Sequence, residues 1–87
     1  MKVRFTPQAE RDLGALDKAT AQRILDKIKW LSENFASIRL EPLHGPWQGA
    51  YKLRVGDYRV IFTLAGRPKD TILIHLIGHR RDIYKQR

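Results

Sequence analysis

The segment 51–62 restricts the fold of this chain more than any other part of the sequence. On both sides of Gly56-Asp57, large apolar residues recur at every second position, namely Tyr51, Leu53, Val55, Tyr58, Val60 and Phe62. Alternation with a period of two is typical of strands that bury one face, and a two-residue connection containing Gly is typical of a hairpin turn. The segment therefore predicts an antiparallel hairpin in which Val55 pairs with Tyr58 and Arg54 pairs with Arg59.

The first third of the chain has mainly helical periodicity. Lys2–Phe5 alternates like a short strand, Thr6-Pro7 supplies a hydroxyl cap and a proline at the first helical position, and Asp17 can cap a second helix. Apolar residues at helical spacing run along that second helix, namely Ala21, Ile24, Leu25, Ile28, Leu31 and Phe35. Because almost no loop separates the two helices, they predict a helical hairpin with one apolar face.

The remaining segments complete one small domain. Residues 36–49 contain two prolines and are predicted to be an irregular connection, whereas residues 71–77 are apolar on both faces, as in a central strand. Residues 79–87 are expected to form a short helix or tail. A chain of 87 residues has room for one core. We therefore predict a single α+β domain, residues 1–87, with the order β-α-α-β-β-β and the helical hairpin packed on a largely antiparallel sheet.

Positive charge is concentrated in the C-terminal part of the chain. The formal net charge is +8, and residues 52–87, with nine Lys and Arg against three Asp and Glu, contribute +6 of it. Such an excess indicates a polyanionic partner. The sequence has no cysteine and no long apolar segment. We therefore expect a cytoplasmic protein that lacks disulfides, a signal peptide and any contact with a membrane.

The hairpin register gathers part of this charge on one face. Lys52, Arg54 and Arg59 should all point away from the core, with Arg54 directly opposite Arg59. Like charges in that position destabilise a sheet, and the only acid nearby in sequence is Asp57 in the turn. An ordinary solvated sheet face is one interpretation. The other is a site for an anion that relieves the repulsion, to which Arg80 and Arg81 would add further charge.

The chemistry that these residues can support is narrow. No paired carboxylates or Ser-His-Asp arrangement stands out, and His75 and His79 straddle the end of a strand, so we expect neither a metal nor a cofactor. Arginine and lysine around a phosphate, with Tyr84 as a packing or base-stacking ring, suit RNA cleavage in which the 2′-OH attacks the adjacent phosphate. That reaction needs in-line positioning, charge neutralisation and two proton transfers. DNA lacks the 2′-OH and could not react in this way.

Two motifs in this half, YKLRVGDYRVIF (51–62) and IGHRRDIYK (77–85), resemble those of the RelE/ParE superfamily of type II toxins, most closely its RelE-like members. The resemblance covers nearly the whole chain, including a lead-in from Leu43 to Trp47. It implies a ribosome-dependent endoribonuclease that cuts mRNA in the ribosomal A site and is neutralised by a cognate antitoxin, expected to be acidic and partly disordered. The alternative within the superfamily is a ParE-like toxin that inhibits DNA gyrase by binding, without nuclease activity.

The resemblance also assigns roles to individual residues. It implies that Lys52, Arg54, Arg59 and Arg80 are the basic catalytic positions and that Tyr84 is the stacking tyrosine; Arg81 and His79 are possible additions. The best-described members of the family carry lysine, a candidate general base, where this chain has Arg54, and arginine stays protonated at any working pH. Arg54 is therefore predicted to hold phosphate. Proton removal is then left to Lys52, Tyr84 or His79.

Overall fold

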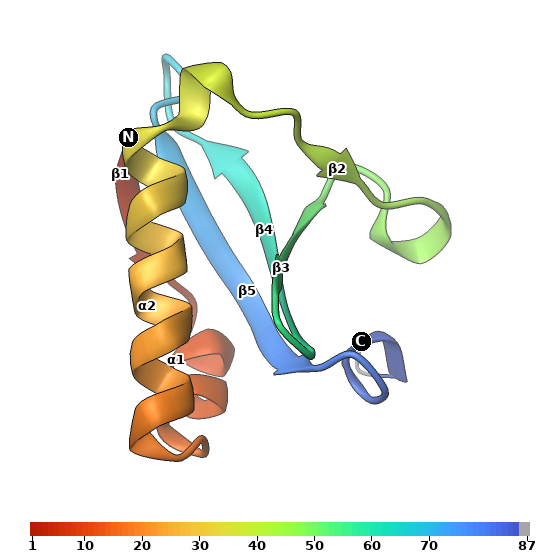
Figure 1. Cartoon of the computed structure of the whole chain (residues 1–87). Helices are drawn as coiled ribbons and strands as arrows, with labels where there is room; N and C mark the ends of the chain where they lie inside the picture. Colours follow the sequence, from red (N-terminus) through yellow and green to blue (C-terminus); the bar gives the residue numbers. More distant parts are fainter. Residues whose placement is uncertain (86–87) are drawn as a thin grey trace.

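Five β-strands form one sheet in the order β1-β5-β4-β3-β2, and both α-helices lie on the same side of it (Figure 1). The structure is a computed structural model that describes residues 1–85. Its strands are β1 (Lys2–Phe5), β2 (Glu41–Pro42), β3 (Tyr51–Val55), β4 (Tyr58–Ala65) and β5 (Thr71–His79); its helices are α1 (Pro7–Gly14) and α2 (Lys18–Glu33); and its short 3₁₀ turns are η1 (Phe35–Ser37), η2 (Gly45–Trp47) and η3 (Ile83–Lys85). β1 runs parallel to β5, and the other neighbouring pairs are antiparallel. The predicted α+β fold is confirmed.

The prediction that residues 36–49 are irregular is wrong in part. Glu41 and Pro42 form β2, which pairs with Lys52 and Tyr51 at the edge of the sheet, and η1 and η2 flank it. A strand of two residues is too short to show a period, and its proline is tolerated because an edge strand leaves one row of N–H groups unpaired. The sheet consequently has one strand more than the sequence indicated.

Both α-helices begin where the sequence predicted. The Thr6 hydroxyl accepts a hydrogen bond from the Ala9 N–H at 3.1 Å, and the Asp17 carboxylate accepts one from the Thr20 N–H at 3.1 Å. Hydrogen bonds from the side chain and the backbone N–H of Thr20 hold the pKa of Asp17 below its ordinary value. The caps therefore start α1 directly after β1 and α2 shortly after α1, with almost no connecting loop.

Helix α1 also covers part of the edge of β5. β1 pairs with β5 only along Thr71–Ile74, which leaves the backbone groups of the following residues without a strand partner on that side. Asp12 accepts a hydrogen bond from the Ile77 N–H at 3.0 Å, and the Thr6 hydroxyl donates to the His75 carbonyl at 3.2 Å. Polar side chains of α1 and its cap thus replace a strand where the ladder ends.

The central hairpin has the predicted register. Val55 pairs with Tyr58 and Arg54 with Arg59 around the turn at Gly56-Asp57. Gly56 has φ of +60° at the first central position, which is the conformation that a type II′ turn requires. A Cβ atom at Gly56 would also lie 2.9 Å from a guanidinium nitrogen of Arg23 on α2, so the turn is packed closely against the helix.

The main core lies between the helices and the sheet. Its largest fully buried members are Ile24, Leu31, Val60, Phe62, Ile72 and Ile74, drawn from α2 and the two longest strands. No helix within residues 1–85 has the length and apolar character needed to cross a membrane.

The face of the sheet away from the helices, called the outer face below, carries a second and smaller core. Ala50, Ile61, Leu76 and Ile83 are buried there, with Leu43 and Trp47 packed against them. The chain end folds back so that Ile83 packs closely over Gly78, where a Cβ atom would lie 3.2 Å from Ile83 Cδ1. The segment around η2 and the C-terminal segment with η3 both lie on the side of the sheet away from the helices (Figure 1). The sequence analysis placed Lys52, Arg54 and Arg59 on this face and did not predict that other segments cover part of it.

Candidate active site

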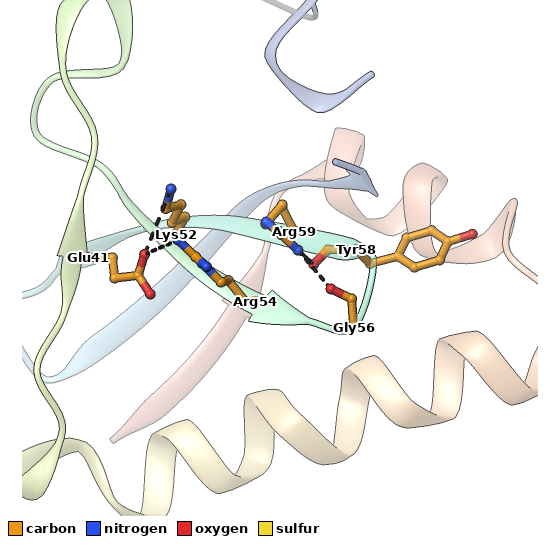
Figure 2. Close-up of polar contacts among 6 residues, drawn as sticks. All are labelled: Glu41, Lys52, Arg54, Gly56, Tyr58 and Arg59. Carbon is orange, nitrogen blue, oxygen red and sulfur yellow. Dashed lines mark hydrogen bonds and ion pairs between the residues drawn. The ribbon is translucent and has the colours of Figure 1, made fainter. Parts of the chain in front are cut away.

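Three cations occupy neighbouring positions of the central hairpin on the outer face. Lys52 and Arg54 alternate with core residues on β3, and Arg59 lies on β4 directly opposite Arg54. The predicted face-to-face arginine pair is therefore present in the backbone register. The two guanidinium groups have different partners: Arg54 is drawn toward β2, while Arg59 turns toward the hairpin loop (Figure 2).

A carboxylate that the sequence analysis missed lies among these cations. Glu41 Oε2 is 3.8 Å from Lys52 Nζ and 3.3 Å from Arg54 Nη2, and the same carboxylate bridges both (Figure 2). The expectation that only Asp57 could relieve the repulsion was wrong, because β2 brings Glu41 next to Lys52 from eleven residues away. The Lys52 side chain is 25% exposed and that of Arg54 59% exposed, so the bridge is accessible to solvent and to a competing anion.

Arg59 is held by the backbone instead of by a carboxylate. Its Nη1 donates to the carbonyl oxygens of Gly56 and Tyr58, each at 2.9 Å (Figure 2). None of the ion pairs within residues 1–85 includes Arg59. The guanidinium has five N–H donors in a planar fork, so this anchoring orients the group and leaves donors for a ligand.

The C-terminal segment joins the site at the hairpin turn. The Arg80 N–H donates to the Asp57 carbonyl at 2.8 Å, and Arg80 Nε lies 3.7 Å from Asp57 Oδ1. Ile83 packs over Gly78, which is the Cα partner of Arg59, and Tyr84 follows with 40% of its surface exposed. The fold-back thus brings a further arginine and an exposed aromatic ring to the end of β4 and β5 that carries Arg59.

The side chain of His79 is not part of this group. The His79 ring packs edge-on against Tyr58, with ring centroids 5.5 Å apart, and Tyr58 belongs to the core on the helix side. Its Nδ1 accepts a hydrogen bond from the Arg81 N–H at 3.2 Å, and the Arg81 side chain is exposed. The Tyr58 ring points away from Arg59 in Figure 2. The structure therefore separates His79 from the cations with which the sequence analysis had grouped it.

The arrangement is suited to holding a phosphodiester. Lys52, Arg54, Arg59 and Arg80 present charged N–H donors around the central hairpin, and charge-assisted hydrogen bonds to phosphate are stronger than neutral ones. In residues 1–85, no three His, Asp or Glu side chains lie close enough together to hold a metal ion. The cationic side chains are thus the means of charge neutralisation that this face provides.

The fold is shared with solved toxins of type II toxin–antitoxin systems. The family model described as "ParE toxin of type II toxin-antitoxin system, parDE" matches residues 3–84. The chain belongs to this family, which is part of the RelE/ParE superfamily. The resemblance read from the two sequence motifs is confirmed at the level of the superfamily.

Solved structures of related proteins share the fold over most of its length. The toxin–antitoxin complex RelBE2 of Mycobacterium tuberculosis contains a chain that is 28% identical, with a TM-score of 0.77 over 91% of this chain and 96% of that one. The archaeal RelE–RelB complex of Pyrococcus horikoshii is similar at 27% identity and a TM-score of 0.70, over 91% and 93% of the two chains. The YoeB/ParE toxin of Agrobacterium tumefaciens, 19% identical, shares the fold with a TM-score of 0.73 over 91% and 98%. No curated protein sequence matches the chain.

Proposed function

We propose that this toxin is a ribosome-dependent mRNA endoribonuclease that cleaves by attack of the 2′-OH on the adjacent phosphate. The observation that carries the proposal is Arg59, a guanidinium oriented by two backbone carbonyls, paired with no carboxylate in residues 1–85, and directly opposite a second arginine. A site that keeps an oriented cation unneutralised is prepared for charge that appears in the transition state. The similarity to RelBE2 and to archaeal RelE at 27–28% identity supports the same assignment.

The cations would have different roles according to their position along the hairpin. Arg59 and Arg80, next to the turn, would stabilise the negative charge of the phosphorane-like transition state. Lys52 and Arg54 would hold the phosphate by taking it in place of Glu41, whose carboxylate uses the same donors. Tyr84, exposed on η3, would stack on a base of the message and help to align the attack.

The site contains few groups that could accept or donate the protons of the reaction. His79 is directed to the other side of the sheet, so it is set aside as a proton acceptor. Lys52, Tyr84 and Glu41 are the remaining groups, and Arg54 cannot lose its proton. Because the chain brings few proton shuttles, we propose that the ribosome contributes by holding the message in line, and that free mRNA is cut poorly.

The partner that restrains the toxin would be a cognate antitoxin. The two similar solved structures at 27–28% identity are, by their descriptions, complexes of a toxin with an antitoxin. The C-terminal half of this chain carries a formal charge of +6, which favours an acidic and partly disordered partner that covers the basic face. Co-expression of such a partner should restore growth and yield a tight complex with the toxin.

Inhibition of DNA gyrase is a second candidate, favoured by the description of the matching family as ParE toxin. A toxin that acts only by binding gyrase has no need for four cations placed around one hairpin. Induction in cells separates the two candidates. Rapid arrest of translation with cuts in mRNA would support the endoribonuclease, whereas gyrase-dependent DNA breaks with intact mRNA would replace it with the ParE-like activity.

The chemistry has its own test on programmed ribosomes. Attack by the 2′-OH should leave a 2′,3′-cyclic phosphate or 3′-phosphate on the upstream fragment and a 5′-OH on the downstream one. A single 2′-deoxy substitution before the cut should abolish cleavage and leave binding nearly unchanged, with the same substitution one nucleotide further on as the control. Fragments with 5′-phosphate ends would refute the mechanism.

A further inference from the structure

A pocket of about 240 Å³ opens on the outer face of the sheet, beside the cations. The segment around η2 forms its wall and strands β4 and β5 form its floor. Its lining includes Trp47, Ala50, Ile61, Thr63 and His75. Ile61 is the Cα partner of Lys52, so the pocket begins on the same face as the proposed phosphate site. Thr63 lies two residues further along β4, about 7 Å away along a strand.

The lining combines an aromatic ring with one polar pair. Trp47 is half-buried, and Ile61 and Ala50 are buried, so most of the surface is apolar. The register of β5 shifts at His75, because Ile61 pairs with Leu76 and Phe62 with Ile74. This bulge turns the His75 ring toward Thr63, and His75 Nε2 lies 2.8 Å from Thr63 Oγ1.

The polar pair can both donate and accept hydrogen bonds. Partial burial lowers the pKa of His75 from its ordinary value, which keeps the ring neutral at pH 7. A neutral imidazole has one donor and one acceptor nitrogen, and the threonine hydroxyl serves in either role. Hydrogen-bonding edges beside an aromatic ring are what proteins use to recognise unpaired bases of RNA.

We propose that this pocket binds one unpaired base of the RNA substrate, adjacent to the phosphate held by Lys52 and Arg54, and so gives cleavage a base preference. The inference rests on the proposed function. The volume supports a single ring system, because pockets that hold drug-sized ligands measure roughly 300–1,000 Å³. The base would stack on Trp47 and place its edge at Thr63 and His75.

Binding of free nucleosides tests the pocket without any cleavage. Adenosine, cytidine and uridine carry no phosphate, so they do not depend on the cations. We expect at least one of them, at millimolar concentration, to shift the indole N–H resonance of Trp47 in ¹H–¹⁵N spectra. Trp30 on α2, 41% exposed, is the internal control, and the variant Trp30→Phe identifies which resonance is which. Equal shifts of both indoles, or no shift with any nucleoside, would overturn the proposal.

Two variants connect the pocket to substrate choice. Thr63→Val keeps the shape and removes one hydrogen bond, so nucleoside affinity should fall about 2- to 12-fold. Trp47→Leu should lower it further, about 5- to 150-fold, through lost stacking. Thr20→Val on α2 is the matched control.

Cleavage of a set of messages that differ in one base connects the pocket to substrate choice. If Thr63→Val and Trp47→Leu cut these messages with the wild-type preference, the pocket does not recognise a base. If nucleosides bind at Trp47 but no RNA is cut, the endoribonuclease proposal is wrong, whereas the assignment of the pocket as a base-binding site is retained.

Discussion

Replacing Glu41 with glutamine removes the carboxylate that bridges Lys52 and Arg54 and leaves an amide of nearly the same shape. In the free protein that carboxylate contacts the two cations at 3.8 and 3.3 Å, on a partly exposed edge of the sheet. A phosphate that binds the same donors must displace it. The variant should therefore bind an RNA backbone more tightly than the wild type does, because no internal anion has to leave first.

The size of the effect follows from the exposure of the two contacts. An exposed ion pair contributes about 0.2–1 kcal/mol, so displacing the bridge costs the ligand about 0.4–2 kcal/mol. At about 1.4 kcal/mol for each factor of ten, Glu41→Gln should tighten binding roughly 2- to 30-fold. Fluorescence anisotropy with a short labelled 2′-deoxy oligonucleotide measures this affinity without cleavage.

Net charge alone could imitate this result, so the control is Glu33→Gln at the C-terminal end of α2. It changes the total charge equally without touching the site and should leave the affinity close to that of the wild type. Glu41→Asp keeps the charge and should bind the oligonucleotide as weakly as the wild type does. If Glu41→Gln binds no more tightly than Glu33→Gln, the carboxylate does not compete with phosphate. Weaker binding by Glu41→Gln would mean that Glu41 orients Lys52 and Arg54 for the ligand.

Four further variants test the cations, the edge of β5 and the partly buried histidine. Arg59→Ala and Arg80→Ala should each lower the single-turnover cleavage rate on ribosomes by about 10²-fold or more, because each removes charge stabilisation from the transition state. Asp12→Ala leaves the Ile77 N–H without its partner and should lower the free energy of unfolding in urea by about 1–3 kcal/mol. The pKa of His75 is lowered in the folded state. Its contribution to stability is therefore complete above about pH 6.5 and is lost as the pH falls toward the folded pKa. In urea unfolding, His75→Gln should lose less of its free energy of unfolding between about pH 7.5 and 5 than the wild type does.

Each of these variants has a matched control. Arg4→Ala on β1 removes an exposed arginine away from the site and should cut at the wild-type rate. Glu10→Ala lies in the same helix as Asp12, and His44→Gln removes an exposed histidine. Full activity of the Arg59 and Arg80 variants would reduce the basic face to a solvated surface. Equal stability of the Asp12 and Glu10 variants, or identical pH slopes for the His75 and His44 variants, would contradict the roles given to those contacts.

Local patterns predicted the parts of the fold that depend on neighbours in the chain. The two helix starts follow from side chains that cap N–H groups three residues away, at Thr6 and Asp17. The register of the central hairpin follows from a two-residue turn, which leaves one pairing that buries the apolar side chains. That register is enough to place Lys52, Arg54 and Arg59 on one face from the sequence alone. The catalytic roles of Arg80 and Tyr84 came from the resemblance, and they stay predictions.

What only the tertiary structure decided involves pairings between distant segments. Glu41 reaches the cations through a two-residue strand, which has no period to detect, and the bulge at His75 depends on the partner strand as much as on its own sequence. His79 was grouped with the cations because it is close in sequence, yet alternation at the end of β5 sends its ring to Tyr58. The outer core forms where Ile83 returns to the sheet and packs over Gly78. In this protein the sequence alone determined which residues line one strand face, and long-range packing decided what lies against them, because side-chain alternation is a local property and contact between separate segments is not.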